Sequence, residues 1–188
     1  ARLLVTLAPD QPEVEGALAL LLLTDVRAAA RISPEGATLP PGQQDRNLWD
    51  RTLLAEGQGL LDRAIARRQP GPFQVKAAIA ALHCETPPDW PQIAALYARL
   101  HPLEPTPVVA LNHAVALAEA GDPETALHRL VAVQHELADY QPFHAAQAEL
   151  FARTRRTAEA RRAYATAIRL ATSPADRAFL QARLSALE

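Results

Sequence analysis

The chain has 188 residues, of which 49% are hydrophobic and 21% charged, and its formal net charge is −2. A chain this long and this apolar can bury a sizeable core, which excludes an intrinsically disordered protein. The near-neutral charge argues against a strongly basic nucleic-acid surface. The longest strongly apolar run, residues 17–23, is far shorter than the roughly 20 residues that span a bilayer. It therefore predicts a buried helix and no membrane segment.

The single cysteine and the first residues bear on location and completeness. Cys84 permits no internal disulfide, which fits a reducing compartment and predicts a cytoplasmic location. Methionine is absent, position 1 included, and the chain opens directly in Arg-Leu-Leu-Val at residues 2–5. This opening indicates a piece of a longer polypeptide.

The first 68 residues predict a pair of long helices. Proline marks the expected helix starts, because its missing N–H costs nothing in the first turn. Asp10, followed by Pro12, therefore predicts a helix that runs to about residue 30. Residues 31–44, rich in proline and glycine, predict the one long loop. A second long helix is expected after Asp45 and runs to about residue 68, so residues 1–68 form one N-terminal part.

From residue 69 to residue 188 the chain falls into shorter helix pairs. Each expected helix begins near a proline or near a capping serine, threonine or aspartate. No useful length of sequence alternates apolar and polar residues with period two, so no sheet is predicted. The expected helices cover residues 73–85, 90–100, 106–121, 142–156 and 173–188, with two more that begin at residues 122 and 157.

A helix-turn-helix pattern recurs after 34 residues. The five matched pairs are Ala114 with Ala148, Leu117 with Phe151, Gly121 with Arg155, Ala126 with Ala160, and Leu130 with Tyr164. A period of about 34 residues with small residues at fixed points is the signature of tetratricopeptide (TPR) repeats. Small side chains let two helices approach closely, while a leucine or an aromatic ring fills the gap beside them.

The repeat predicts an all-α fold, a TPR-like solenoid of helical hairpins over residues 69–188, probably continuous with the N-terminal helix pair. The hairpin at residues 73–100 is a degenerate repeat, because Gln92 falls where the later repeats carry alanine. The last helix is expected to cap the solenoid, with Arg177 and Arg183 on one side and an apolar side formed by Phe179, Leu180, Leu184 and Leu187. Stacked hairpins create a concave surface that normally holds another protein or another part of the same chain.

The densest polar cluster is Gln-Asp-Arg-Asn-Leu-Trp-Asp at residues 44–50. In a structural interpretation, Asp45 caps the following helix, Arg46 pairs with Asp50 at i, i+4, and Trp49 is buried against a neighbouring helix. In a functional interpretation, Arg46 and Asp50 are displayed to a partner. The structural interpretation is favoured.

Two further motifs contain candidate contact residues. Asp89, Trp90 and Pro91 combine a helix cap, an aromatic ring and an early-turn proline, which sets the entry angle of a helix and leaves any contact by Trp90 secondary. Asn112 and His113 lie on the helix of the first clear repeat, in the stretch that lines the concave face of solenoids. A mid-helix asparagine is mildly unfavourable unless its amide is used, either within the chain, which is favoured, or by a partner's backbone.

Metal binding and catalysis are not expected. The histidines show no HExxH arrangement and Cys84 has no CxxC companion, so neither a metal ion nor another cofactor is predicted. The chain also has no GxSxG motif and no glycine-rich phosphate loop, so it is not predicted to be an enzyme. The six histidines are His83, His101, His113, His128, His135 and His144.

Several sequence blocks, in order, resemble the long C-terminal extension of one group of bacterial extracytoplasmic-function RNA polymerase sigma factors. In that group, one domain for the upstream promoter element and one for the melted element and core polymerase are followed by a TPR-like extension of about this length. No basic helix-turn-helix replaces those domains here. The blocks lie at residues 44–50 (Gln-Asp-Arg-x-x-Trp-Asp), 56–61, 70–81, 89–97 and 107–112 (Pro-Val-Val-Ala-Leu-Asn).

The resemblance implies a regulatory domain that controls transcription initiation through protein–protein contacts. Its expected partners are its own sigma-factor domains, the RNA polymerase core, or a signalling protein, and this fragment is not expected to bind promoter DNA itself. The alternative is a free-standing TPR-like adaptor that binds peptides or partner proteins in the solenoid groove. The candidate partner-contact residues are Asp45, Arg46, Trp49, Asp50, Trp90, Pro91, Asn112 and His113.

Overall fold

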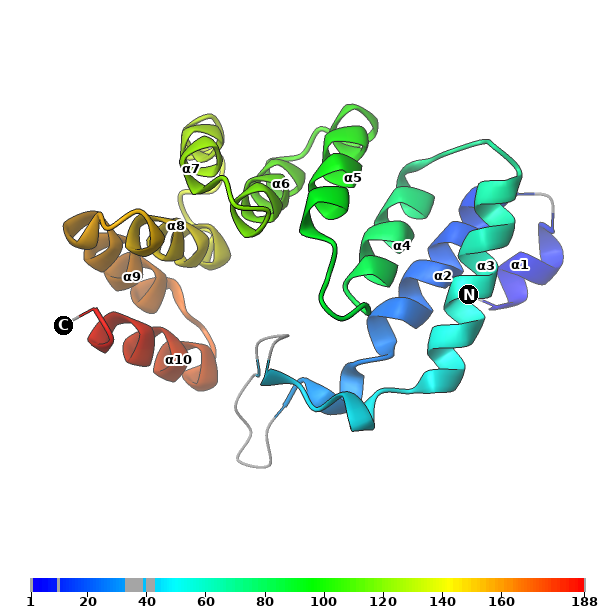
Figure 1. Ribbon diagram of the computed structural model, residues 1–188, viewed down its shortest axis with the longest axis horizontal. Coiled ribbons are helices and arrows are strands. Elements are labelled where there is room, and N and C mark those ends of the chain that lie inside the picture. Colours follow the sequence, from blue (N-terminus) through cyan, green and yellow to red (C-terminus); the bar gives the residue numbers. More distant parts are fainter. Residues whose placement is uncertain (1, 10, 33–38, 40–42, 188) are drawn as a thin grey trace. The chain divides into compact units, whose positions relative to one another are not determined.

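The computed structural model describes residues 2–9, 11–32, 39 and 43–187, and every regular element among them is a helix (Figure 1). The predicted all-α class is confirmed. The chain divides into two compact units, Ala1–Glu104 and Pro105–Glu188. This boundary differs from the expected division after residue 68, because α4 (Pro72–Leu82) packs closely on α2 (Pro12–Asp25) of the first unit.

Helix α2 lies at the centre of the first unit, in contact with α1, α3 and α4. Two glycines allow this close packing. A Cβ at Gly16 would lie 2.9 Å from the backbone nitrogen of Gln74 on α4, and a Cβ at Gly57 would lie 2.8 Å from Leu23 on α2. The remaining described elements of this unit are α1 (Arg2–Leu7), η1 (Ala28–Ala30), η3 (Arg46–Leu48), α3 (Arg51–Ala66) and α5 (Trp90–Leu103).

The N-terminal helices differ from the expectation at their ends. Helix α1 was not predicted, and α2 ends at Asp25 instead of continuing to about residue 30. The reason for the early end is tertiary, because the N–H of Asp50 donates to the carbonyl of Val26, which takes up an acceptor freed at the end of α2. Asp10 and most of the predicted loop lie outside the described residues.

The second unit is built from two helical hairpins and a final helix. Helix α6 packs on α7, α8 packs on α9, and α9 packs on α10. Prolines occupy the first or second position of α6, α7, α8 and α10, which agrees with the predicted starts. The five helices are α6 (Pro107–Glu119), α7 (Pro123–Val131), α8 (Gln141–Arg153), α9 (Thr157–Leu170) and α10 (Pro174–Ser185).

The sequence repeat corresponds to a repeat of local packing. The four matched alanines are each completely buried, and Leu130 and Tyr164 are buried beside them. Leu117 and Phe151 are partly buried and pack against the same two clusters. The small side chains therefore lie where each pair of helices meets, as predicted. The four alanines are Ala114, Ala126, Ala148 and Ala160.

The turns of the two hairpins also match. Gly121 has a φ of 106° and Arg155 has a φ of 61°, so both residues adopt the left-handed conformation that ends a helix. In each turn the following N–H reaches back to the helix, from Asp122 to the carbonyl of Leu117 at 3.0 Å and from Arg156 to the carbonyl of Phe151 at 2.8 Å. The second turn makes the same bonds without the glycine.

Replacing Arg155 with glycine is expected to stabilise the protein. The left-handed conformation costs an L-residue about 1–2 kcal/mol, of which glycine's greater loss of backbone entropy returns part, so we expect a net gain of about 0.5–1 kcal/mol. Urea unfolding followed by circular dichroism measures the change. Arg155→Ala is the control, because it keeps the Cβ and should bring no gain; a lower urea midpoint for Arg155→Gly would contradict the prediction.

Helix α10 covers the end of the second hairpin. Leu180 is buried against α9, and Leu184 and Leu187 pack beside it, as expected for a capping helix. Phe179 is an exception, because 44% of it is exposed and it does not join the apolar side. The reason is its position on the helix, since consecutive residues point about 100° apart and Leu180 takes the buried place.

Arginine side chains bind the free carbonyls at several helix ends. A helix leaves its last carbonyls without intrahelical partners and carries partial negative charge there, so a guanidinium is a favourable cap. Arg31 donates to Thr24 of α2, and Arg177 donates to Ala171 at the end of α9. Three further bonds of this kind run from Arg46 to Cys84 and Glu85, from Arg153 to Ala118, and from Arg161 to Leu187. Much of the positive charge is thereby used inside the fold.

Candidate functional site

The polar cluster at residues 44–50 forms two consecutive helix caps. Asp45 accepts a hydrogen bond from the N–H of Asn47 and so caps only the short helix η3. Asp50 caps α3, accepting from the N–H groups of Thr52 and Leu53 at 2.8 and 3.0 Å. The predicted cap by Asp45 of the long helix is therefore wrong. The extended backbone of Trp49 and Asp50 separates the two helices.

Arg46 ties this segment to the end of α4. Its two terminal nitrogens donate to the carbonyls of Cys84 at 3.3 Å and Glu85 at 2.7 Å. Its guanidinium also lies 4.4 Å from the centre of the Trp49 ring, which adds a cation–π contact. The predicted pairing of Arg46 with Asp50 is wrong, because each side chain is engaged by backbone groups. Arg46 therefore holds two elements of the first unit together.

Trp49 is buried, as expected, and forms a small apolar cluster with Val26 and Ala30. Leu53, Leu54 and Cys84 pack around this cluster. The indole Nε1 of Trp49 lies inside the protein without a hydrogen-bond partner. The ring therefore serves packing, and neither Trp49 nor Arg46 is displayed to a partner in this arrangement.

Trp90 and Pro91 stand at the start of α5. Asp89 caps this helix by accepting from the N–H of Gln92, as predicted. Trp90 is half-buried and meets the ring of His83 edge to face, with 5.2 Å between the ring centres. Pro91 is exposed. The pair mainly fixes the connection between α4 and α5, which agrees with the structural interpretation.

His83 and Cys84 are adjacent, but their environment is not that of a catalytic pair. Burial lowers the pKa of His83, and the positive charge of Arg27 lowers it further. Burial raises the pKa of the Cys84 thiol, although Arg27 and Arg46 oppose this. The imidazole is thus kept neutral and the thiol protonated, whereas a reactive cysteine needs a lowered pKa.

Asn112 and His113 lie on opposite sides of α6. His113 is buried among the helices of the second unit, with 7% of its surface exposed. Asn112 is exposed, and the favoured internal use of its amide finds no support in the contacts of the described residues. Of the two candidates, Asn112 is the one that a partner can reach.

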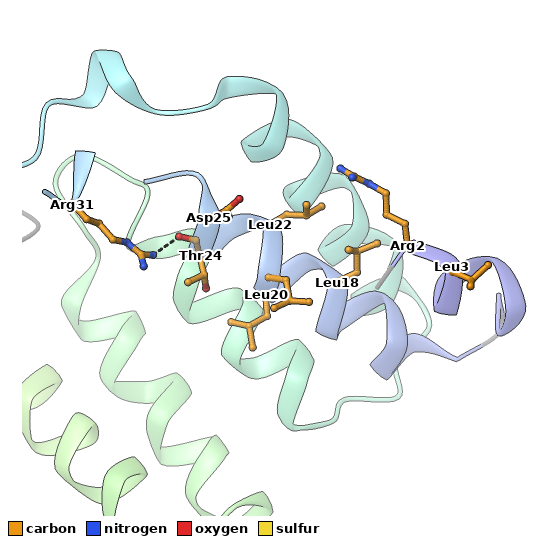
Figure 2. Close-up of a pocket in the computed structure, with 9 residues that line it drawn as sticks. Arg2, Leu3, Leu18, Leu20, Leu22, Thr24, Asp25 and Arg31 are labelled. Atoms are coloured by element: carbon orange, nitrogen blue, oxygen red, sulfur yellow. Dashed lines mark hydrogen bonds between the residues drawn. The ribbon is translucent and has the colours of Figure 1, made fainter. Parts of the chain in front are cut away.

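An open groove along α2 was not foreseen from the sequence (Figure 2). It has a volume of about 850 Å³ and runs from the first residues of α1 to the end of α2 and Arg31. Leu18 and Leu22 form part of its floor, while Leu21 is 56% exposed, so the apolar run at residues 17–23 is not fully buried as predicted. The groove is lined by Arg2, Leu3, Leu18, Leu20, Leu21, Leu22, Thr24, Asp25 and Arg31.

The sequence did contain a signal for this groove. Residues 17–23 read Ala-Leu-Ala-Leu-Leu-Leu-Leu, with no polar residue on any side of the helix. A helix that is apolar all round is normally covered all round. The exposed Leu21 therefore marks a side of α2 that the described helices leave uncovered.

A second, smaller hollow lies between α8 and α9 of the second unit. Its volume is about 290 Å³, and its lining is mostly polar. Within the described residues, no three histidine, cysteine, aspartate or glutamate side chains gather as metal ligands would. Nor does any described helix have the length and apolar character needed to cross a membrane. The lining residues are His144, Gln147, Phe151, Glu159, Arg162, Ala163 and Thr166.

Comparison with known proteins gives a relative but no function. Residues 1–65, which contain the groove, match the Family of unknown function (DUF6596). The whole chain is 41% identical, over 191 aligned residues, to "Uncharacterized protein R00370" of Rhizobium meliloti (strain 1021). The chain spans 45% of that protein, so more than half of the relative lies outside the match. No solved structure matches the chain. The chain is thus similar, from end to end, to part of a much longer uncharacterized protein.

Proposed function

We propose that this chain is the C-terminal regulatory region of a bacterial extracytoplasmic-function sigma factor and acts in transcription initiation through protein–protein contacts. The observation that carries the proposal is the ordered series of sequence blocks between residues 44 and 112. The length of the relative supports it, because the part of that protein outside the match leaves room for sigma domains. Such a protein works in the cytoplasm, where the polymerase is.

The positions of the blocks in the first unit support a shared fold with that group. Arg46, from the block at residues 44–50, binds carbonyls just beyond α4, and α4 itself carries the block at residues 70–81. Blocks far apart in sequence thus meet at one joint of the unit. Residues retained for such contacts describe a framework, so the resemblance concerns architecture more than a ligand site.

The second unit supports a TPR-like arrangement. Two hairpins place alanines at the same crossing points and end their first helices with the same left-handed turn. Repeats of this kind stack and present surfaces to proteins. The use of arginines on helix-end carbonyls also reduces the positive charge left for DNA phosphates, which supports contact with proteins in place of promoter DNA.

Removal of residues 1–188 from the full-length protein tests the proposal. We expect transcription from its target promoter, with purified core polymerase, to change by at least about fivefold, the lower range of coupling between two sites. Binding of the shortened protein to core polymerase is the control, since it shows that the sigma domains remain folded. Unchanged transcript levels with intact core binding would contradict the proposal.

A peptide-binding adaptor is the second candidate, favoured by the exposed Asn112 and by the polar hollow between α8 and α9. This function predicts that the 188-residue chain alone captures extended or helical peptides, and that Asn112→Ala or Gln147→Ala weakens the capture. A regulator of its own sigma domains would instead bind those domains when they are supplied as a separate protein. Isothermal titration with a peptide library and with the sigma domains distinguishes the two.

A further inference from the structure

Helix α2 lacks a cover on one side. Leu18 and Leu22 point into the first unit and are at most 8% exposed, whereas Leu21, between them along the chain, is 56% exposed. On α1, Leu3 is 68% exposed and lines the same groove. Two large apolar side chains thus face an open trough whose floor is already apolar. Contiguous exposed apolar surface of this kind usually marks a contact site.

The groove continues the line of α1. Helix α1 forms a hairpin with α2 and runs in the opposite direction to it (Figure 1). Arg2 and Leu3, at the start of α1, form one end of the groove, and Asp25 and Arg31 form the other end (Figure 2). The trough therefore begins where the first turn of α1 begins and follows the uncovered part of α2.

The lengths of the two helices show how much is missing. Helix α1 has 6 residues and α2 has 14. At 1.5 Å per residue these are about 9 and 21 Å long, so α2 extends about 12 Å, or some eight residues, past the start of α1. A helix of about two further turns would pair with α2 along its whole length.

We propose that the polypeptide preceding residue 1 in the longer protein extends α1 by about two turns and fills this groove. Its start at the rim makes that segment the occupant with the smallest entropic cost, because it is already tethered there. The relative, of which the chain spans only 45%, shows that a similar sequence exists inside a longer polypeptide. The proposal is independent of the sigma-factor function, since it concerns how the groove is covered and not what the preceding domains do.

The chemistry of the groove defines the segment. It is a helix with apolar residues spaced three and four apart, which pack on Leu3, Leu18 and Leu21. At the far end, where Asp25 and Arg31 form the rim, the segment becomes polar.

Thiol labelling tests the proposal directly. Leu21→Cys is made in a Cys84→Ala background, in three proteins: the 188-residue chain, the same chain with its native 12 preceding residues, and the full-length protein. We expect maleimide to label position 21 at least about tenfold more slowly in both longer proteins, because the covered state opens only part of the time. Ile65→Cys, at a residue that is 53% exposed on α3 and outside the groove, is the matched control and should react equally in all three.

Each other outcome overturns the proposal. Equal labelling of position 21 in the three proteins would leave the groove open. Protection only in the full-length protein would assign the groove to a more distant domain, and protection that increases with protein concentration would assign it to a second copy. An initiator methionine directly before residue 1 would leave no segment to fill it. Circular dichroism of every variant shows that the fold is kept, and no transcription assay enters the result.

Discussion

Replacing both Arg63 and Arg67 with alanine is expected to lower the free energy of unfolding by about 3–5 kcal/mol, the usual cost of leaving a buried charge without its partner. The carboxylate of Glu15, on α2, is buried, with 4% of the residue exposed. The Nε atoms of the two arginines lie 3.4 and 3.5 Å from its oxygens. Both arginines are partly exposed, so the main cost is the stranded carboxylate and not the loss of surface charge.

The controls separate charge from packing. Adding Glu15→Gln to the double variant should restore most of the loss, because a neutral amide is far cheaper to bury than a carboxylate. Replacing Arg51 and Arg99, which are exposed elsewhere in the first unit, should change stability by about 0.5 kcal/mol or less. Urea unfolding at pH 7 measures all three. A loss below about 1 kcal/mol in the double variant would show that water solvates Glu15, which would contradict the prediction.

The features predicted well from the sequence are those fixed by neighbouring residues. Pro107, Pro123 and Pro174 set φ and lack an N–H, so each marks a helix start without any information from the rest of the chain. The buried alanines were identified for a related reason. A repeated requirement for close packing writes the same residue type at a fixed interval, which a single sequence reveals.

The features that were missed depend on contacts between distant residues. Asp45 and Asp50 are both good caps, and the choice of Asp50 for α3 follows from Trp49 packing on Val26, more than 20 residues away. The carbonyls bound by Arg46 lie 38 and 39 residues further along the chain. No local pattern gives such distances, so the pairing of Arg46 with Asp50 looked equally reasonable.

The unit boundary at residue 104 and the groove were missed for the same physical reason. The repeat pattern groups α4 with the later hairpins, but the close approach of Gly16 to Gln74 joins α4 to α2. The apolar run at residues 17–23 predicted burial, yet burial depends on which elements are available to cover it. The sequence therefore identified the helix and its apolar character, but not its uncovered side.

Replacing both Ala126 and Ala160 with leucine is expected to lower the free energy of unfolding by about 1–3 kcal/mol for each change. Both alanines have no exposed surface, and each lies at the crossing of its hairpin, beside Leu130 in one case and Tyr164 in the other. A leucine there must push the two helices apart or leave its preferred rotamer. Because the two sites lie in separate hairpins, their effects should be nearly additive.

Ala120→Leu is the matched control for this prediction, since it adds the same three carbons at an exposed position at the end of α6. It should change stability by about 0.5 kcal/mol or less. Thermal and urea unfolding of the three single variants and the double variant provide the comparison. If leucine cost as little at Ala126 and Ala160 as at Ala120, the alanines would not be the points of helix contact. The 34-residue repeat would then lack its physical cause, and with it the argument for a TPR-like second unit.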